Sequence, residues 1–451
     1  MGENAVASAR DFIWGPPLIV LLCGVGLYLT VFGGFLQFRR LPLILRLTLC
    51  SLFIRNKKRR KGAVSPFRAM SAALAGTLGI GNIIGVAGAV MLGGPGAVFW
   101  MWVSGFIGMM TKFSEVALAV RFREKASGGG YAGGPMHYIV NGLGERFRPL
   151  AALFSLMCIL ASFGIGNMTQ ISSIAGAAEK SFGTPALFTG ILAAVLVGLT
   201  IFGGFSRISA ITSVIVPVMS VFYILGSLTV IAVNYANILP AFGDIFKGAF
   251  TPSAAAGGAA GFTAAQAIRF GVSRGVFTHE AGMGSAPIAH AGADTESPVE
   301  QGFWGAFEVF ADTLVICTLS ALVILTTGVM NTRPAQGSLA VSQAFGSVFA
   351  NYGEYFITVA VIFFAFSTIL GWAYYAERCC SFLFKKHEKR AVSVFRGIFV
   401  LAVAAGSLIK AGTVWNLADI FNGLMAFPNL IALILLSPVV FNMLKRYFAR
   451  R

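Results

Sequence analysis

Charged residues are scarce in this chain. Asp, Glu, Lys and Arg make up 11% of its 451 residues, whereas a typical soluble domain contains about 25%. Hydrophobic residues make up 57%, and the mean hydropathy is +0.79. This composition excludes a soluble globular protein, a disordered chain, a collagen-like chain and a small secreted domain held by disulfides. It predicts an all-α integral membrane protein with many spans.

Reactive and metal-binding side chains are also few. The six cysteines and four histidines include no CxxC pair and no HExxH motif. We therefore interpret the cysteines as free thiols, not as zinc ligands or redox centres. The sequence predicts no enzyme and no cofactor.

Long polar segments are lacking too. The connectors near 124–147, 236–258 and 329–351 are too short for a soluble domain, so residues 1–451 are predicted to form one transmembrane domain. Apolar runs of about 20 residues predict eleven spans, at 12–35, 66–92, 95–122, 149–178, 184–203, 208–234, 259–288, 302–328, 353–383, 393–411 and 416–443.

Positive charges are unevenly distributed among the connectors. Most of the 34 Lys and Arg residues fall on one side if the N-terminus is outside, and the positive-inside rule puts that side in the cytoplasm. This pattern predicts a cytoplasmic C-terminus, and it indicates contact with lipid and not with nucleic acid. Residues 39–55 are amphipathic and lead into the basic run at 55–61. A surface helix on anionic lipid and a solvated connector are both open interpretations.

Two predicted spans contain too many glycines for regular helices. Span 66–92 includes GTLGIGN at 76–82, and span 259–288 has four glycines between 271 and 284 beside ionisable residues. Irregular backbone at membrane depth is tolerated only where it is buried or lines a wet cavity. These spans are the second and the seventh, and broken helices five apart are typical of an inverted-repeat transporter. The predicted units are an extra N-terminal helix at 12–35 and two five-helix repeats at 66–234 and 259–443.

Breaks of this kind expose backbone groups at both half-helix ends. Free N–H groups suit a carboxylate, and free carbonyls suit a monovalent cation. A zwitterion carried with sodium is therefore the expected cargo. The alternative is that the glycines serve close helix packing, which is the interpretation we favour for GIGN at 164–167.

Several long motifs resemble the alanine/glycine:cation symporter family. They are GIGNIIG at 79–85, LGGPGAVFWMW at 92–102, MTKFSE at 110–115, GGPMHY at 133–138 and RGVFTHEAGMGSAP at 274–287. The resemblance extends from about residue 12 to 445. It implies the leucine-transporter fold and sodium-driven uptake of alanine or glycine across a bacterial or archaeal plasma membrane. His137 and His279 depart from the pattern expected of the family, which leaves ion choice and pH dependence more open.

The resemblance also implies a substrate site. Residues 79–82 resemble the unwound segment of the fold, so N–H groups of Ile80, Gly81 and Asn82 would face the substrate carboxylate, with Thr77 nearby. In the seventh span, carbonyls from Phe270 to residue 273 would bind the ammonium. The other expected pocket residues are Gln266, Val272, Val276, Thr368 and Trp372, and Trp372 would limit the size of the substrate.

The sodium site implied by the resemblance lies between two spans. Ser367 and Thr368 in the ninth span would supply hydroxyls, and Ala75 and Leu78 would supply carbonyls. Asn82 would bind both cargo and ion. Taken alone, Ser and Thr in a membrane helix usually bond the carbonyl one turn back.

The remaining ionisable residues within spans are expected to be paired. Lys112 and Glu115 are three apart on one helix. Glu308 and Asp312 are candidates to meet Arg269 or Arg274. Glu280 is the candidate for gating or coupling.

The function predicted from these observations is sodium-coupled import of alanine, glycine or a similar small neutral amino acid by alternating access. Proton coupling, motivated by His279 and Glu280, is the alternative. A channel is disfavoured because repeated pore loops and rings of like charge are missing. The preference among alanine, glycine and D-amino acids, the ion stoichiometry and the oligomeric state are left open by the sequence.

Overall fold

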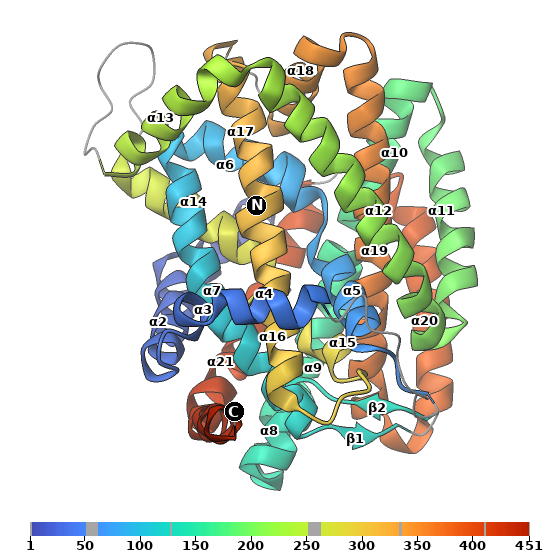
Figure 1. Ribbon diagram of the computed structural model, residues 1–451. Coiled ribbons are helices and arrows are strands. Elements are labelled where there is room, and N and C mark those ends of the chain that lie inside the picture. The colour runs from blue at the N-terminus through green and yellow to red at the C-terminus, as the bar shows by residue number, and fades with distance from the viewer. Residues whose placement is uncertain are drawn as a thin grey trace.

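Long apolar helices make up most of the computed structural model, which describes residues 2–50, 62–126, 129–250, 263–332, 336–409 and 412–450 (Figure 1). Helices dominate because a helix satisfies its own backbone hydrogen bonds, which lipid cannot do. By length and hydropathy, seven of the described helices can cross a membrane. The bent pair Pro66–Thr77 and Gly81–Gly93 makes an eighth span.

Each of the eleven predicted spans coincides with one helix or with consecutive helices. They are α2 (Pro16–Phe32), α5 (Pro66–Thr77) with α6 (Val86–Gly93), α7 (Gly96–Arg121), α9 (Arg148–Phe163) with α10 (Thr169–Phe182), α11 (Ala186–Ile201), α12 (Gly204–Val233), α14 (Ala264–His279) with α15 (Pro287–His290), α16 (Pro298–Val309) with α17 (Thr318–Thr326), α19 (Tyr352–Leu383), α20 (Glu388–Gly406) and α21 (Gly412–Ala449).

Shorter elements lie between these spans. They are the helices α1 (Gly2–Ile13), α3 (Leu36–Arg39), α4 (Leu41–Leu49), α8 (Pro135–Leu143), α13 (Ile238–Phe250) and α18 (Gly337–Phe349), and the antiparallel strands β1 (Glu124–Lys125) and β2 (Tyr131–Ala132). Figure 1 shows α8 and the strands at one end of the molecule, and α13 and α18 at the other. The predicted surface helix at 39–55 corresponds in part to α4, which packs against α16. The basic run that follows lies outside the described residues.

The first break separates α5 from α6. Helix α5 ends at Thr77, Leu78 is extended, and a π-helical turn from Gly81 to Gly85 leads into α6 after a 56° bend. Space is limited at this bend, because a Cβ added to Gly79 would lie 2.8 Å from the Thr368 hydroxyl oxygen. Glycine therefore allows the break to approach α19.

The second break begins later than the sequence analysis predicted. Helix α14 is continuous to His279, so Phe270 and residue 273 lie within a regular helix whose carbonyls accept helical hydrogen bonds. The irregular segment starts at Glu280, and Gly282 and Gly284 have φ of +92° and +84°. Residues 271–275 also read G-x-S-x-G. Their place inside a helix does not provide the strand-to-helix turn of a hydrolase nucleophile.

The long helices form two groups that meet at the first break. In one group, α7 packs against α14 and α16, and α5 packs against α16. In the other group, α9 and α10 pack against α19, and α11 packs against α20. Figure 1 shows α7 and α14 on one side of the molecule, and α10, α11 and α20 on the other. Because α19 also packs against α5, the break is in contact with both groups.

The N-terminal helices contact both α21 and the first group. Helix α2 packs against α7 and α21, and α1 packs against α21. At the turn between them, the Trp14 indole N–H donates to the Asp419 carbonyl oxygen at 2.7 Å. The Trp14 ring also lies 5.8 Å from the Phe277 ring on α14, between centroids.

Candidate substrate and cation site

A cavity of about 210 Å³ lies beside the first break. Its walls come from the break, from the last turn of α14, from the π-helical turn between α9 and α10, and from α19. Its lining residues are Gly76, Thr77, Gly79, Ile80, Gly81, Ile84, Gly85, Gly88, Ile165, Thr169, Gln170, Arg274, Phe277, Thr278, Glu280, Gly337, Thr368 and Trp372. The cavity thus combines free backbone groups of a broken helix with a few polar side chains, the arrangement expected for a small zwitterion.

Several residues predicted to bind substrate line this cavity. Thr77, Ile80 and Gly81 come from the first break, and Thr368 and Trp372 come from α19. Trp372 is fully buried. Its Cβ occupies the space next to Gly166, where an added Cβ would lie only 2.3 Å away. The indole therefore has little room to move out of the cavity.

Asn82 lies behind the cavity wall. Its side-chain oxygen accepts a hydrogen bond from the Gly79 N–H at 3.0 Å, and its Nδ2 donates to Asp312 Oδ1 at 2.6 Å. The Nδ2 atom also lies 3.3 Å from Cys317 Sγ. In this arrangement Asn82 links the break to the segment between α16 and α17.

Four predicted residues of the seventh span do not line the cavity. Gln266 is exposed and forms a capping box with Thr263 at the start of α14. Phe270, Val272 and Val276 are absent from the lining. Because α14 stays helical to His279, the C-terminal end of α14 reaches the cavity and the middle of α14 does not.

Arg274, Phe277 and Thr278, in the last two turns of α14, line the cavity. The Arg274 guanidinium stacks 4.9 Å from the centre of the Phe277 ring. It also packs against Gly85, where an added Cβ would lie 2.6 Å from the guanidinium carbon. Their spacing of three and four residues is the helical signal that could have identified them.

The proposed sodium ligands are partly brought together. The Thr368 hydroxyl donates to the Leu78 carbonyl at 3.2 Å and to the Phe364 carbonyl at 3.0 Å. Helices α5 and α19 touch closely here, since a Cβ added to Gly371 would lie 2.6 Å from the Gly76 nitrogen and 3.3 Å from the Ala75 carbonyl carbon. A hydroxyl and a free carbonyl are hard oxygen ligands, which suit a small alkali cation.

Ser367 points differently from its neighbour. Its hydroxyl donates to the Phe364 carbonyl at 2.9 Å and lies 3.6 Å from Met219 Sδ on α12. Ser367 is therefore held by its own helix, as the alternative interpretation of this Ser-Thr pair expected.

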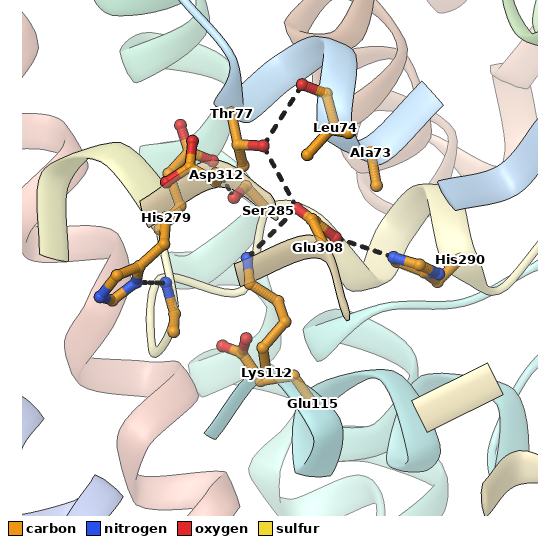
Figure 2. Close-up of polar contacts among 12 residues, drawn as sticks. Ala73, Leu74, Thr77, Lys112, Glu115, His279, Ser285, His290, Glu308 and Asp312 are labelled. Carbon is orange, nitrogen blue, oxygen red and sulfur yellow. Dashed lines mark hydrogen bonds and ion pairs between the residues drawn. The ribbon is translucent and has the colours of Figure 1, made fainter. Parts of the chain in front are cut away.

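A cluster of buried charges lies next to the site (Figure 2). Lys112 Nζ is 3.8 Å from Glu308 Oε1 and pairs with that residue, not with Glu115. Asp312 accepts hydrogen bonds from Asn82 and, at 2.7 Å, from Thr313. The expectation that an arginine pairs with Glu308 or Asp312 is therefore wrong for the described contacts. Lys112 pairs with Glu308, and the Asn82 amide and the Thr313 hydroxyl donate to Asp312.

Two carboxylates hold the second break in place. Glu115 Oε1 accepts hydrogen bonds from the N–H groups of Gly282 and Gly284, each at 3.0 Å, and from Asn429 Nδ2 at 2.6 Å. Glu280 is in the left-handed region with φ of +50° and accepts a hydrogen bond from the Ser285 hydroxyl. Glu115 thus satisfies two backbone N–H groups that a regular helix would otherwise satisfy, whereas Glu280 accepts from a side chain.

Comparison with known proteins decides the family. A sequence model of the sodium:alanine symporter family matches residues 1–451. The chain belongs to the sodium:alanine symporter family. Within it, the sodium/alanine symporter AgcS of Methanococcus maripaludis is 41% identical over 449 residues, which cover 98% of this chain and 97% of that protein. The putative sodium/proton-dependent alanine carrier protein YrbD of Bacillus subtilis is 38% identical over 456 residues, which cover 98% of this chain and 92% of that protein.

The fold of this sodium:alanine symporter family member is similar to that of solved transporters. The crystal structure of MhsT in complex with L-phenylalanine matches with a TM-score of 0.57 at 13% identity, covering 86% of this chain and 99% of that one. This similarity confirms the leucine-transporter-like fold. The relatives named above are a symporter and a carrier, so the family is one of transporters.

Arg123 fastens the segment after α15 at the end of the symporter that carries β1 and β2. Arg123 NH1 donates to the carbonyls of Ala291 and Ala293 at 2.9 and 2.6 Å, and NH2 donates to the Thr295 carbonyl at 2.7 Å. The Phe205 and Tyr374 rings stack nearby with centroids 4.1 Å apart.

Neither histidine that departs from the symporter motifs lines the cavity. His279 Nδ1 accepts a hydrogen bond from the Ala281 N–H at 3.0 Å and thereby ends α14. His137 lies on α8, with Nδ1 3.8 Å from Glu124 Oε1. Of the two residues that motivate the proton-coupling alternative, His279 does not line the cavity and Glu280 does.

Proposed function

We propose that this protein is a sodium-coupled symporter that imports alanine, glycine or a similarly small neutral amino acid by alternating access. The observation that carries the proposal is the contact between the Thr368 hydroxyl and the Leu78 carbonyl at the first break, next to a small cavity. One face of the break offers N–H groups to a carboxylate, and the other offers oxygen ligands to a cation.

The size of the cavity supports a small substrate. At about 210 Å³ it is smaller than the roughly 300–1,000 Å³ pockets that hold drug-sized ligands. The Trp372 indole occupies one wall and is packed against Tyr375 with centroids 5.8 Å apart. A bulky side chain on the substrate would have to displace this indole.

The distribution of Lys and Arg supports an orientation with the N-terminus outside and the C-terminus in the cytoplasm. In this orientation the end closed by Arg123 faces the cytoplasm. We assign residues 66–234 and 259–443 as the two repeats, with 12–35 as the extra helix, in an inner or plasma membrane. The repeat assignment follows the two breaks, which lie five spans apart.

The proposal is tested by uptake of radiolabelled alanine into proteoliposomes. We expect concentrative uptake with an inward sodium gradient, and only equilibration when sodium is replaced by potassium on both sides. Excess glycine or D-alanine should compete to different extents, which ranks the substrates, whereas excess glutamine should compete weakly. Equal concentrative uptake without sodium would reject sodium coupling.

A proton-coupled transporter of the same fold is the second candidate. Its support is the set of buried carboxyl groups beside the cavity, at Glu115, Glu280, Glu308 and Asp312. It predicts alanine uptake driven by an inward proton gradient in sodium-free buffer. Measuring uptake with each gradient separately distinguishes the two couplings.

A further inference from the structure

Arg274 is a charged residue of the cavity that the proposed transport mechanism leaves without a role. It lies on α14, within the seventh predicted span, and its side chain is partly exposed and lines the cavity. Among the described residues of the lining, Arg274 is the one cation. A charge within a span is costly and is found where it faces a partner or a water-filled cavity. This position therefore indicates a function.

Neighbouring groups fix the place of the guanidinium. It lies 4.9 Å from the centre of the Phe277 ring, and the Phe277 ring lies against that of Trp14. On the first break, a Cβ added to Gly85 would lie 2.6 Å from the guanidinium carbon and 2.6 Å from Nη1, and a Cβ added to Gly81 would lie 3.9 Å from Nη1. Glycine at position 85 thus leaves the space that the guanidinium fills, beside the backbone of the break.

The N–H donors of this guanidinium have no protein acceptor among the described residues. An arginine presents several such donors in a planar fork, and it accepts no hydrogen bonds. The electrostatic neighbours of Arg274 are Asp419 on α21 and Cys317 on the segment between α16 and α17, and the described contacts include no ion pair to either. The fork is therefore available to a ligand in the cavity.

Backbone donors lie next to the same fork. The half-helix that leads into α6 begins at the break, and the first N–H groups of a helix have no acceptor within it. Ile80 and Gly81 belong to this first turn and line the cavity. The positive end of the helix dipole adds to the charge of Arg274. A planar fork beside free N–H groups suits a carboxylate, which accepts from both.

We propose that Arg274 binds the carboxylate of the substrate and makes a free carboxylate a condition for binding. This inference rests on the proposed function and narrows its substrate class to amino acids that carry a carboxylate and a neutral side chain. A second ammonium group, as in a diamino acid, would enter the positive potential of the guanidinium and is disfavoured. Arg274 thus selects by charge, whereas Trp372 selects by size.

The competing interpretation is that Arg274 only holds α14 against α21 through Asp419. The Asp419 backbone carbonyl accepts the Trp14 indole N–H, so this part of α21 already has a link to the N-terminal helices. If Arg274 acts only on Asp419, then Asp419→Asn should reproduce the effect of removing the arginine. If Arg274 binds substrate, Asp419→Asn should change the alanine affinity by less than about fivefold, as expected for a charge pair without close contact.

The test compares two ligands on the full chain in lipid nanodiscs. L-Alaninamide keeps the amino group and the methyl side chain of alanine and replaces the carboxylate by a neutral amide. The affinity of each ligand is obtained from the rise in melting temperature as its concentration increases, in saturating sodium. We expect the wild type to bind alanine at least about a hundredfold more tightly than L-alaninamide, because the amide leaves the fork unpaired.

Arg274→Met removes the charge and keeps an unbranched side chain beside Phe277. We expect alanine to bind roughly thirty- to a hundredfold more weakly to this variant, since a buried charge pair loses one partner. L-Alaninamide should bind as tightly as before or more tightly, so the preference for alanine should fall below about tenfold. A loss of fold would weaken both ligands together. Arg274→Lys keeps the charge without the fork and should recover part of the alanine affinity.

Two controls separate binding from folding. Arg269→Met is the matched control, because Arg269 is an exposed arginine on the same helix and is absent from the cavity lining. It should keep the wild-type preference for alanine. Sodium alone should still raise the melting temperature of Arg274→Met, since the proposed sodium ligands at Leu78 and Thr368 do not include Arg274.

Each contrary result has a distinct meaning. Equal affinity of the wild type for alanine and L-alaninamide, or an unchanged alanine affinity in Arg274→Met, would overturn the carboxylate site while the proposed symport stands. An equal loss of alanine affinity in Arg274→Met and Asp419→Asn would assign Arg274 to structure and would also overturn it. Alanine binding to the wild type that is the same with and without sodium would instead reject sodium coupling, and the two ligands would still decide the role of Arg274.

Discussion

Thr368 joins the two helix groups through a single hydroxyl. Its Oγ1 donates to the Leu78 carbonyl across the first break, and it also donates to Phe364 within α19. A cation that takes the Leu78 carbonyl would take the Thr368 oxygen as well, since both oxygens already face each other. Removing this hydroxyl therefore tests the proposed cation site directly.

Thr368→Val keeps the size of the side chain and removes the oxygen. We expect the sodium concentration for half-maximal alanine uptake to rise about tenfold, which corresponds to the roughly 1.4 kcal/mol that one oxygen ligand contributes. The control is Thr358→Val, at the other threonine of α19, whose hydroxyl bonds the Ser181 hydroxyl at 2.6 Å. An unchanged sodium dependence in Thr368→Val would contradict the proposed cation site.

The residues predicted from a motif that coincides with a break lie at the candidate cavity, and their role there stays a prediction. Thr77, Ile80, Gly81, Thr368 and Trp372 all line the cavity, because the glycine-rich motif at 79–82 marks the point where the helix ends. The prediction was less accurate where a residue's place depends on how a helix is rotated. Gln266 and Val272 were placed from the start of the glycine-rich stretch, and the cavity lies at its end.

At the level of helices, glycines have two different roles in the seventh span. Gly271 and Gly275 lie against α7, where an added Cβ would come within 2.2 Å of the Ala97 carbonyl oxygen and 2.0 Å of the Ser104 hydroxyl oxygen. Gly282 and Gly284 instead have positive φ. Composition does not distinguish packing glycines from glycines in a break, and this is why the predicted break lies about two to three turns too early.

Glu115 stabilises this break from a neighbouring helix. In Glu115→Ala, the N–H groups of Gly282 and Gly284 and the Asn429 amide lose their shared acceptor. Each buried donor left unpaired costs about 1–3 kcal/mol. We expect a clear fall in the apparent melting temperature of the protein in detergent, together with weaker alanine binding.

Glu115→Gln serves as the comparison for that prediction. A glutamine oxygen can still accept from the two glycine N–H groups, so the melting temperature should recover most of the loss. Equal stability of the alanine variant and the wild type would mean that the break is held by other contacts.

For the whole molecule, the decisive contacts are those that close the end with β1 and β2. Arg123 makes three hydrogen bonds to carbonyls after α15, and its guanidinium also stacks 3.8 Å from the centre of the Tyr131 ring. Nothing in the sequence indicated this closure, because carbonyl acceptors are backbone groups and leave no pattern in the side chains.

Arg123→Ala should loosen this end of the protein. Hydrogen bonds from a charged donor contribute about 1.5–3 kcal/mol each, so amide hydrogen exchange in residues 287–295 should accelerate at least about tenfold. Arg148→Ala is the control, since Arg148 is exposed and pairs only with Glu145 among the described contacts. Exchange that is unchanged in Arg123→Ala would assign the closure to the Phe205–Tyr374 stack.

The predicted spans and the order of the two breaks agree with the structure because apolar runs and clustered glycines are local signals. The contacts within each helix group are not local. They depend on pairs such as Lys112 with Glu308, or Gly166 with Trp372, which lie roughly two hundred residues apart in the chain. Physical reasoning from one sequence can expect such charges to be paired, but it does not specify the partner.

The turn between α1 and α2 has a mechanical consequence. Through Trp14 it touches the Asp419 carbonyl on α21 and the Phe277 ring on α14, while α2 lies along α7. Any rotation of α14 and α7 relative to α21 must stretch or break these contacts. The N-terminal helices would therefore restrain that rotation, and with it the alternating access proposed above, although they contribute no residue to the cavity lining.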